Sequence, residues 1–365
     1  MNDFWRGRRV LLTGHTGFKG GWLALKLSEL GASVYGLALA PEMPDSFFDL
    51  CGLEHAIHSS IGDVRDPSIV RRALEVSDAE IVFHLAAQAL VRRSYRDPAA
   101  TFETNVMGTV NVLDAIRRYP AVRSAVIVTS DKCYENHSSP RSHREDDRLG
   151  GADPYSASKA CAELVAHAYA RSFFDNADCR IAIATARAGN VIGGGDNSLD
   201  RIVPDAVRAL SRKEALIVRS PAAVRPWQHV LEPLTGYLML AERLYMDGQQ
   251  WGGAWNFGPD DGAAVSVAEL VEMLIHDWGE GSWRAEPTSD GLHESPFLSL
   301  NSDRARTLLS WQPRFKLRDA VRLTVEWYHE ALSGPSAKMY QFTVRQLRQY
   351  EDLLHAPEGP VAASR

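Results

Sequence analysis

The chain is poor in cysteine, and its few thiols show no metal-binding pattern. Only four of 365 residues are cysteine, at positions 51, 133, 161 and 179, and none lies in a CxxC or CxxH spacing. We therefore expect small buried or half-buried thiols and no metal site. No apolar stretch approaches the ~20 residues that span a bilayer, and the N-terminus carries no apolar leader. These absences predict a soluble cytoplasmic protein without a membrane partner.

Basic charge is not in excess either. Forty basic and 46 acidic residues give a net charge of −6, without a basic tail, so nucleic acid is not an expected partner. The sequence also lacks internal repeats and low-complexity tracts. Its 45% hydrophobic and 24% charged residues are ordinary for a globular protein. A length of 365 residues predicts about two domains.

Short apolar runs alternate with amphipathic helical patterns through the first half of the chain. The runs are nearly continuous, as in parallel strands that are covered on both faces. This alternation predicts a doubly wound parallel α/β sheet of the Rossmann type. The expected strands are 9–13, 33–39, a run ending at 62, 80–85, 125–129 and 180–185, and the expected helices begin near 18 and span 100–119 and 154–174.

A glycine-rich turn separates the first expected strand from the first helix. Gly14, Gly17 and Gly20 form a GxxGxxG pattern, which permits a tight turn and lets backbone N–H groups approach a pyrophosphate. At this position the pattern predicts a bound dinucleotide. The acidic residue expected about 20 positions later is not evident, and no arginine replaces it. NAD is therefore favoured over NADP.

Three further residues belong to this predicted cofactor site. Asp63 follows the third strand, where it could bind the adenine amino group or serve as a loop carboxylate or helix cap. His15 and Lys19 place larger side chains in the turn than a bare glycine loop needs. They either weaken NAD binding or help to hold the pyrophosphate, and both alternatives remain open.

Tyr155 and Lys159 form the predicted catalytic pair. They stand four residues apart on one helix face, and Asp153 and Pro154 are suited to begin that helix. A lysine ammonium beside a phenol lowers the pKa of the phenol, which makes the tyrosinate a base for a sugar hydroxyl. Ser130, at the end of the preceding strand, can bind the same hydroxyl or cap the next turn.

After residue 190 the pattern becomes less regular. A loop signal occupies 193–197, and a clear helix follows at 266–275, where Ser266 and Glu269 form a capping box. We predict a Rossmann domain over 1–189 with a return segment near 222–260. A smaller mixed α/β substrate-binding domain follows over 190–335, and a flexible tail over 355–365.

Several motifs together resemble the extended short-chain dehydrogenase/reductase superfamily: residues 13–20, 62–64 and 84–88, the strand end at Ser130, and Tyr155-xxx-Lys159. Residues 129–134 resemble the corresponding strand end of nucleotide-sugar 4,6-dehydratases, with Lys132 where those enzymes have Glu. Residues 14–20, 130–136, 187–196 and 225–233 are similar to the subgroup that acts on CDP-glucose. The resemblance extends to about Trp327.

This resemblance implies NAD as cofactor and CDP-glucose as substrate. The implied cofactor-binding residues are Gly14, His15, Thr16, Gly17, Phe18, Lys19, Gly20, Asp63, Val64, Leu85, Ala86, Ala87, Tyr155 and Lys159. The implied substrate-binding residues are Gln88, Asn190, Arg201, Arg225, Asn256 and His293. Among them, Asn190 would hold the diphosphate end of the sugar nucleotide, and the two arginines would neutralise its phosphates.

The implied reaction is oxidation at C4, loss of water across C5–C6 and return of the hydride to C6. Tyr155 would take the O4 proton, Ser130 would orient O4, and Asp131 would protonate the departing hydroxyl. Lys132 would be the C5 base, although a lysine starts near pKa 10.4 and needs a large downward shift. Its alternative role is to stabilise the developing enolate.

Two rival functions share this fold. A sugar-nucleotide 4-epimerase uses Tyr, Lys and Ser but needs no acid and base for elimination, so Asp131 and Lys132 argue against it. A non-catalytic NAD-sensing protein would commonly lack part of the Tyr/Lys/Ser set. The resemblance also implies a homodimer formed through helices that correspond to 105–119 and 154–174.

Overall fold

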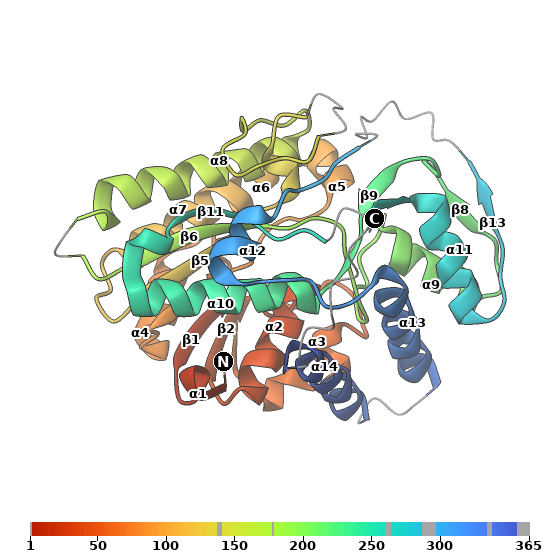
Figure 1. Cartoon of the computed structure of the whole chain (residues 1–365). Helices are drawn as coiled ribbons and strands as arrows, with labels where there is room; N and C mark the ends of the chain where they lie inside the picture. The colour runs from red at the N-terminus through yellow and green to blue at the C-terminus, as the bar shows by residue number, and fades with distance from the viewer. Residues whose placement is uncertain are drawn as a thin grey trace.

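A seven-stranded parallel sheet with helices on both faces lies at the centre of the molecule (Figure 1). The computed structural model describes residues 2–136, 141–176, 179–259, 264–286, 297–333 and 338–355. The strand order is β11-β6-β5-β4-β1-β2-β3, so the predicted doubly wound α/β class is confirmed. The strands are β1 (Arg9–Thr13), β2 (Ser33–Ala38), β3 (His58–Ile61), β4 (Ile81–His84), β5 (Ser124–Val128), β6 (Ala182–Arg187) and β11 (Gly253–Asn256).

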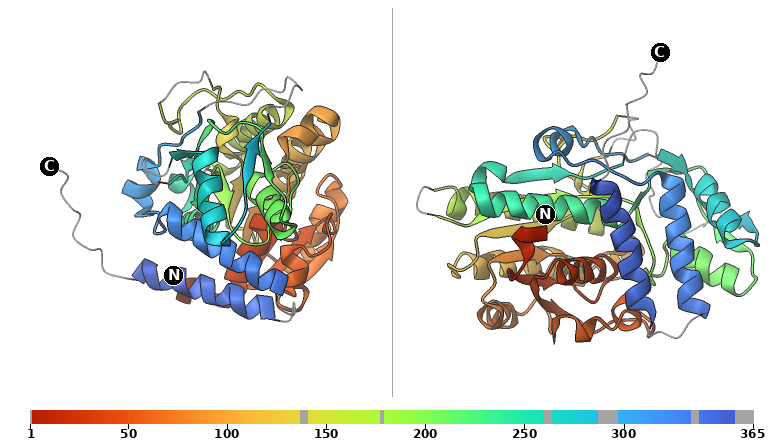
Figure 2. Two further views of the ribbon diagram at one scale, coloured as in Figure 1. Left: turned by 90° about the vertical axis from the view of Figure 1, so that its right-hand side faces the viewer. Right: turned by 60° about the horizontal axis from the view of Figure 1, so that its bottom comes forward.

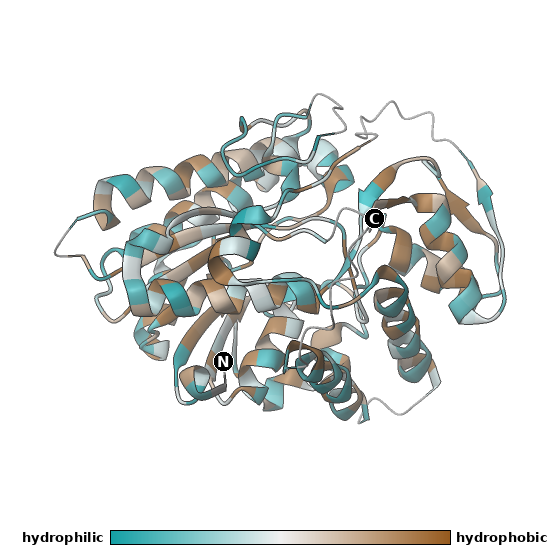
Figure 3. Ribbon diagram, in the orientation of Figure 1, coloured by the Kyte–Doolittle hydropathy of each residue, from teal (hydrophilic) through white to brown (hydrophobic). Residues whose placement is uncertain are grey.

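Successive residues of the central strands enter two separate cores. In β1, Val10 and Leu12 pack into one core, while Leu11 packs into the other. β1 pairs with β2 on one side and with β4 on the other. Both faces of these strands are therefore apolar, and Figure 3 shows hydrophobic residues in brown along the strands at the centre of the molecule. This two-sided burial explains the continuous apolar runs in the sequence.

Each face of the sheet is covered by its own set of helices. One set contributes to the core around Leu11 and comprises α4 (Pro67–Ser77), α7 (Gly108–Ile116) and α8 (Pro154–Tyr169). The other set packs around Val10 and comprises α2 (Phe18–Glu29), α10 (Leu231–Asp247), α12 (Asp303–Leu309) and α14 (Met339–His355).

Two predicted long helices are interrupted by π-helical turns. The helix expected over 100–119 consists of α6 (Pro98–Phe102), a π turn η2 (Glu103–Met107) and α7. Within this turn, the Asn105 side chain bonds both the N–H and the C=O of Gln88 at 2.8 and 3.0 Å. The second helix, α8, likewise continues into a π turn, η4 (Ala170–Phe174). The sequence pattern does not distinguish such turns from regular helix.

The second half of the chain contributes smaller sheets beside the large one (Figure 2). Their two-stranded pairs are β7 (Val191–Ile192) with β10 (Gln228–His229), β9 (Val224–Pro226) with β12 (Ala264–Ser266), and β8 (Leu216–Val218) with β13 (Trp283–Ala285). Their helices are α9 (Ile202–Ser211), α11 (Val267–Trp278) and α13 (Leu317–Ser333). The capping box of Ser266 and Glu269 at the start of α11 is confirmed. Strand β11 and helix α10 return to the large sheet from this half.

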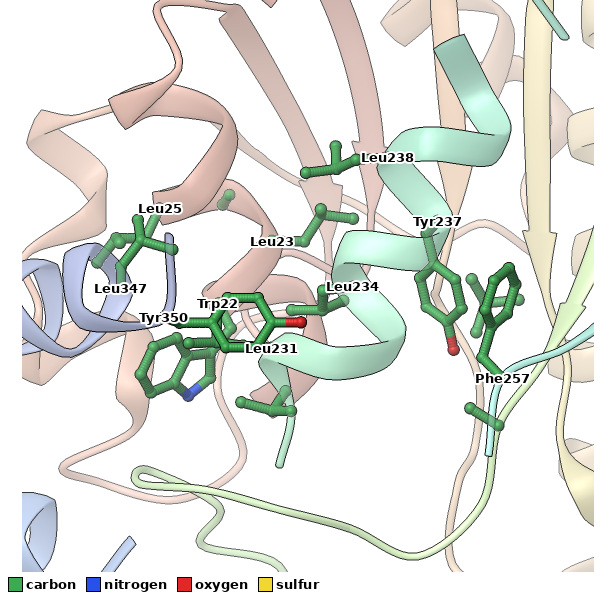
Figure 4. Packing of buried hydrophobic residues seen from close by; sticks show 14 of the residues in the cluster. Trp22, Leu23, Leu25, Leu231, Leu234, Tyr237, Leu238, Phe257, Leu347 and Tyr350 are labelled. Carbon is green, nitrogen blue, oxygen red and sulfur yellow. The ribbon is translucent and has the colours of Figure 1, made fainter. Parts of the chain in front are cut away.

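Helices α2, α10 and α14 pack together through apolar side chains (Figure 4), and Glu232 of α10 is buried among them. The Glu232 carboxylate accepts hydrogen bonds from the Arg314 and Phe315 backbone N–H groups at 2.9 and 2.7 Å. It also accepts one from the Tyr350 hydroxyl at 2.7 Å. Lys26, 1% exposed, donates to Thr235 at 2.7 Å. Burial raises the pKa of Glu232 to about 7 and lowers that of Lys26 to about 8.

The remaining elements are short. They are α1 (Asn2–Trp5), α3 (Phe47–Leu50), α5 (Val91–Arg96), and the 3₁₀ turns η1 (Leu53–His55), η3 (Asp131–Cys133) and η5 (Gly248–Trp251). The cysteines are free; Cys51 and Cys133 are buried, whereas Cys161 and Cys179 are half-buried, as predicted. Within the described ranges, no helix combines the length and apolarity that a membrane span requires. Apart from His355, the predicted flexible tail lies outside the described residues.

Candidate active site

A cavity of about 770 Å³ opens at the carboxyl ends of the central strands. The glycine turn between β1 and α2 forms one wall. Gly14 has a φ of +83°, and a Cβ there would lie 2.7 Å from the Ala86 nitrogen. A Cβ at Gly20 would collide with the carbonyl oxygen of Gly14. Gly17 begins α2 without a side-chain cap. The turn thus needs glycine at positions 14 and 20 and directs the positive end of α2 toward the cavity, which fits a pyrophosphate.

The two large residues of this turn have different surroundings. His15 is fully buried, with its ring against Gly36 and its Nε2 2.7 Å from the Ser59 hydroxyl. Burial lowers its pKa to about 4, and it is absent from the residues that line the cavity. Lys19 does line the cavity. Burial lowers its pKa to about 8, while the negative charge of Asp131 acts in the opposite direction. His15 therefore packs the turn, and Lys19 projects toward the catalytic end.

The predicted adenine side of the cavity is lined by Asp63 and Val64. The Asp63 carboxylate pairs with Arg65 at 2.6 Å, and this hydrogen bond lowers its pKa. Leu85, Ala86 and Ala87, which follow β4, line the same cavity, as do Thr16 and Phe18.

The predicted catalytic residues come together at the ends of β5 and α8. Asp153 caps α8 by accepting the Ser156 N–H at 2.9 Å, and Pro154 occupies its first turn, as predicted. This start places Tyr155 and Lys159 on the cavity wall with Ser130, Asp131 and Lys132 of the β5 end, and all five residues line it. The predicted constellation therefore shares one cavity.

Hydrogen bonds order this constellation. The Ser130 hydroxyl donates to the Asp131 Oδ1 at 3.0 Å and accepts the Lys132 N–H at 3.2 Å. The Lys159 Nζ donates to the Val128 carbonyl at 3.2 Å. The Asp131 Oδ2 is buried and has no hydrogen-bond partner among the described residues. A Cβ on residue 189 would occupy the position of this oxygen, so Gly189 is required there.

The charge state of Tyr155 departs from the sequence expectation. Burial raises its pKa to about 12, although a hydrogen bond with Ser130 and the nearby Arg201 guanidinium act to lower it. The expected lowering of this pKa is therefore wrong for the protein alone, because loss of water around the phenol outweighs the Ser130 hydrogen bond and the Arg201 charge. Burial also lowers the pKa of Lys159 to about 8.

The predicted substrate residues divide into three groups. Gln88, Asn190, Arg201 and Arg225 line the cavity. Arg201 pairs with Asp196 at 2.9 Å, and its charge acts on Tyr155, so it lies nearer the catalytic end than a purely phosphate-binding role suggests. His293 lies outside the described residues.

Asn256 lies outside the cavity that most of the predicted substrate residues line. It is fully buried; its amide accepts the Tyr134 hydroxyl hydrogen bond and donates to the His143 and Asn301 carbonyls. These bonds occupy its polar atoms, and it is absent from the cavity lining. Its predicted contact with nucleotide is therefore corrected to a packing role.

Sequence reasoning missed an ion pair on the cavity wall. Arg219, directly after β8, bonds Asp200 at 2.8 Å, and Arg92 approaches the same carboxylate at 3.8 Å. All three residues line the cavity. No motif marks them, because they come from three distant segments.

The chain is similar to known proteins along most of its length. Residues 10–258 match the NAD dependent epimerase/dehydratase family, and the chain belongs to that family. A CDP-glucose 4,6-dehydratase of Salmonella typhimurium is 45% identical over 91% of this chain and 93% of its own length. A dTDP-glucose 4,6-dehydratase of Streptomyces griseus is 31% identical over 74% of this chain and 76% of its own.

A solved structure shares the architecture. DesIV, a dTDP-glucose 4,6-dehydratase from Streptomyces venezuelae with NAD bound, superposes with a TM-score of 0.76 and is 26% identical. The alignment covers 88% of this chain and 97% of that chain.

Proposed function

We propose that the protein is a dehydratase that converts CDP-glucose to CDP-4-keto-6-deoxyglucose and water. The observation that carries this is the presence of Asp131 and Lys132 beside Ser130, Tyr155 and Lys159 in one cavity. A C4 epimerase requires only the last three. The 45% identity to a CDP-glucose 4,6-dehydratase over 91% of the chain supports the same conclusion.

The glycine turn is suited to hold the NAD pyrophosphate, with Asp63 and Val64 toward the adenosine end. When bound, NAD⁺ supplies the acceptor for the C4 hydride and the donor that returns it to C6. Lys159 would hold the nicotinamide ribose through its ammonium. Arg225 and Asn190 would hold the diphosphate of the substrate through charge-assisted and amide hydrogen bonds.

Each catalytic side chain has one task in this reaction. Tyr155, in its phenolate form, takes the proton from O4, assisted by Ser130, which orients that hydroxyl. The charge of Lys159 must therefore offset the burial that raises the pKa of Tyr155 in the protein alone. The resulting 4-ketone acidifies the C5 proton, so elimination follows oxidation. Lys132, as the neutral amine, removes the C5 proton, and Asp131, which must be protonated at that step, donates a proton to the departing O6 hydroxyl. The free Oδ2 of Asp131 supports this last assignment, since that atom has no partner among the described residues.

The test is to incubate the purified protein and NAD⁺ with CDP-, dTDP-, UDP- and GDP-linked hexoses, and to follow their masses. Loss of one water from CDP-glucose is the expected result. Inversion at C4 without mass change would identify an epimerase. Absence of any reaction despite NAD binding would favour a non-catalytic NAD-binding protein.

A separate variant tests the role of Lys132. Lys132→Met should abolish exchange of the substrate C5 proton with solvent while C4 oxidation continues. Unchanged exchange would refute its role as the base and leave enolate stabilisation as the alternative.

The proposal includes a homodimer formed through α7 and α8. Leu164 on α8 is 58% exposed, and Phe173 in the following π turn is 44% exposed. Large apolar side chains at the surface favour burial against a partner. Ala160, Ala162 and Ala166 pack inside the monomer and do not support this interface.

A further inference from the structure

A buried carboxylate lies one helical turn behind the catalytic lysine. Glu163 follows Lys159 by four residues on α8, so both stand on the same helix face. Its carboxylate accepts hydrogen bonds from Thr129 at the end of β5 and from Thr185 on β6, the second at 2.7 Å. Arg187 forms an ion pair with the same carboxylate, with 2.7 Å between the Arg187 Nη2 and the Glu163 Oε2. Glu163 is 3% exposed and does not line the cavity.

Arg187 extends this group away from the cavity. It is also 3% exposed, and its Nη1 donates to the Tyr134 hydroxyl at 2.6 Å and to the Glu145 carbonyl at 3.0 Å. The Tyr134 hydroxyl in turn donates to Asn256. The packing role of Asn256 thus belongs to a continuous polar chain that begins at Glu163.

Packing alone does not explain this arrangement. Removing two charges from water is costly, and apolar residues of similar volume often stabilise a protein equally well. Here the pair lies directly behind Lys159, whose own charge the proposed reaction requires. Burial lowers the pKa of Lys159 to about 8, and Glu163 is the leading charge that opposes this effect.

We propose that Glu163 is a positioning residue of the catalytic site: its carboxylate keeps the Lys159 ammonium charged and fixes the ends of β5 and β6 against α8. The catalytic consequence rests on the proposed dehydratase function. A charged ammonium stabilises the Tyr155 phenolate during removal of the O4 proton, so its loss slows oxidation. Arg187 and the two threonines hold the carboxylate in place.

Other titratable groups surround Lys159 and Glu163. They are Tyr155 on α8, Asp131 and Cys133 on η3, His84 on β4, Lys19 on α2 and Arg187 on β6. Burial lowers the pKa of His84 to about 3 and raises that of the Cys133 thiol, so both are uncharged near neutral pH. Lys19 is a cation and cannot replace Glu163.

The first experiment measures the protonation of Lys159 without using turnover. The full-length protein with NAD is labelled with trace acetic anhydride across a pH series, and peptide mass spectrometry scores acetylation of Lys159. In Glu163→Gln, the midpoint for Lys159 should fall by about one pH unit. Exposed Lys213 is the internal reference and should not change. An unchanged Lys159 midpoint would overturn the proposal.

Two further variants separate charge from packing. Thr185→Val removes a hydrogen bond to Glu163 but retains the charge, so the Lys159 midpoint should stay at the wild-type value. If Glu163→Gln does not fold because Arg187 is left unpaired, Glu163→Gln/Arg187→Gln removes both charges. It should shift the midpoint downward by less than Glu163→Gln alone, because loss of the Arg187 cation acts in the opposite direction, and a wild-type midpoint in that double variant would also overturn the proposal.

Kinetics supply the catalytic readout. The alkaline limb of the pH profile of kcat should move down by about one pH unit in Glu163→Gln, with KM for CDP-glucose within about threefold of wild type. A loss of kcat that is equal at every pH would indicate a purely structural role and refute the proposal. If the wild type does not dehydrate CDP-glucose, the proposed function fails, while the labelling result still tests the effect of Glu163 on Lys159.

Discussion

Replacing Glu232 with glutamine removes one ionisable group from the core between α2, α10 and α14. Its carboxylate accepts three hydrogen bonds, from two backbone N–H groups and the Tyr350 hydroxyl. A glutamine carbonyl oxygen can retain the two backbone bonds, and the amide nitrogen can donate to the Tyr350 oxygen. The substitution is therefore expected to preserve the packing seen in Figure 4 and to change chiefly the charge.

The direction of the effect follows from the pKa. In the folded protein the pKa of Glu232 is about 7, compared with 4.5 ordinarily. Between these values the folded state retains a proton that the unfolded state has lost, so wild-type stability falls as the pH rises through this window. The difference corresponds to about 3 kcal/mol of unfolding free energy, complete above about pH 7. Glutamine carries no such penalty.

Urea unfolding at about pH 5 and about pH 7.5 measures this difference. Glu232→Gln should gain about 2.5 kcal/mol relative to wild type between the two pH values, because part of the wild-type loss has already occurred at pH 5. Glu75→Gln, at an exposed carboxylate on α4, is the matched control and should keep a constant difference from wild type. If Glu232→Gln followed the wild-type pH dependence, the assignment of a proton to buried Glu232 would be incorrect.

Three other substitutions test the site and the assembly. Gly189→Ala inserts a Cβ against the Asp131 carboxylate and displaces it, so water loss should slow at least about tenfold in protein that circular dichroism shows to be folded. An unchanged rate would contradict the proposed acid. Gly14→Ala places a Cβ at a residue whose φ is +83°, and that Cβ would lie too close to the Ala86 backbone. NAD affinity measured by calorimetry should therefore fall at least about tenfold, and wild-type affinity would argue against this turn as the cofactor site. Leu164→Glu should yield monomers in sedimentation analysis if α8 forms the dimer interface, and an intact dimer would place the interface elsewhere.

The sequence predicted the features that depend on local pattern. Apolar runs marked the central strands to within a few residues, because both faces of those strands are buried. The glycine turn and the start of α8 at Asp153 and Pro154 were also predictable, since each requires particular residues at particular spacings.

Properties that depend on distant segments were not predictable. His15 carries a polar side chain within a cofactor motif, yet β2 passes so closely that its ring is buried under Gly36. Asn256 resembles a substrate ligand but is occupied by Tyr134 and two carbonyl groups from other segments. The raised pKa of Tyr155 likewise reflects the depth of the finished cavity, which sequence spacing does not reveal.

The position of β11 has a consequence for synthesis of the protein on the ribosome. This strand, Gly253–Asn256, forms the outer edge of the large sheet beside β6, although the two strands are more than 60 residues apart in the chain. Helix α10, which covers β5 and β6, also emerges late. Until about residue 256 has left the ribosome, β6 presents an unpaired edge and an uncovered apolar face, both of which favour aggregation. The nascent chain therefore has a vulnerable interval, and a fragment that ends near residue 190 should be insoluble even though it contains the entire glycine turn and the catalytic pair.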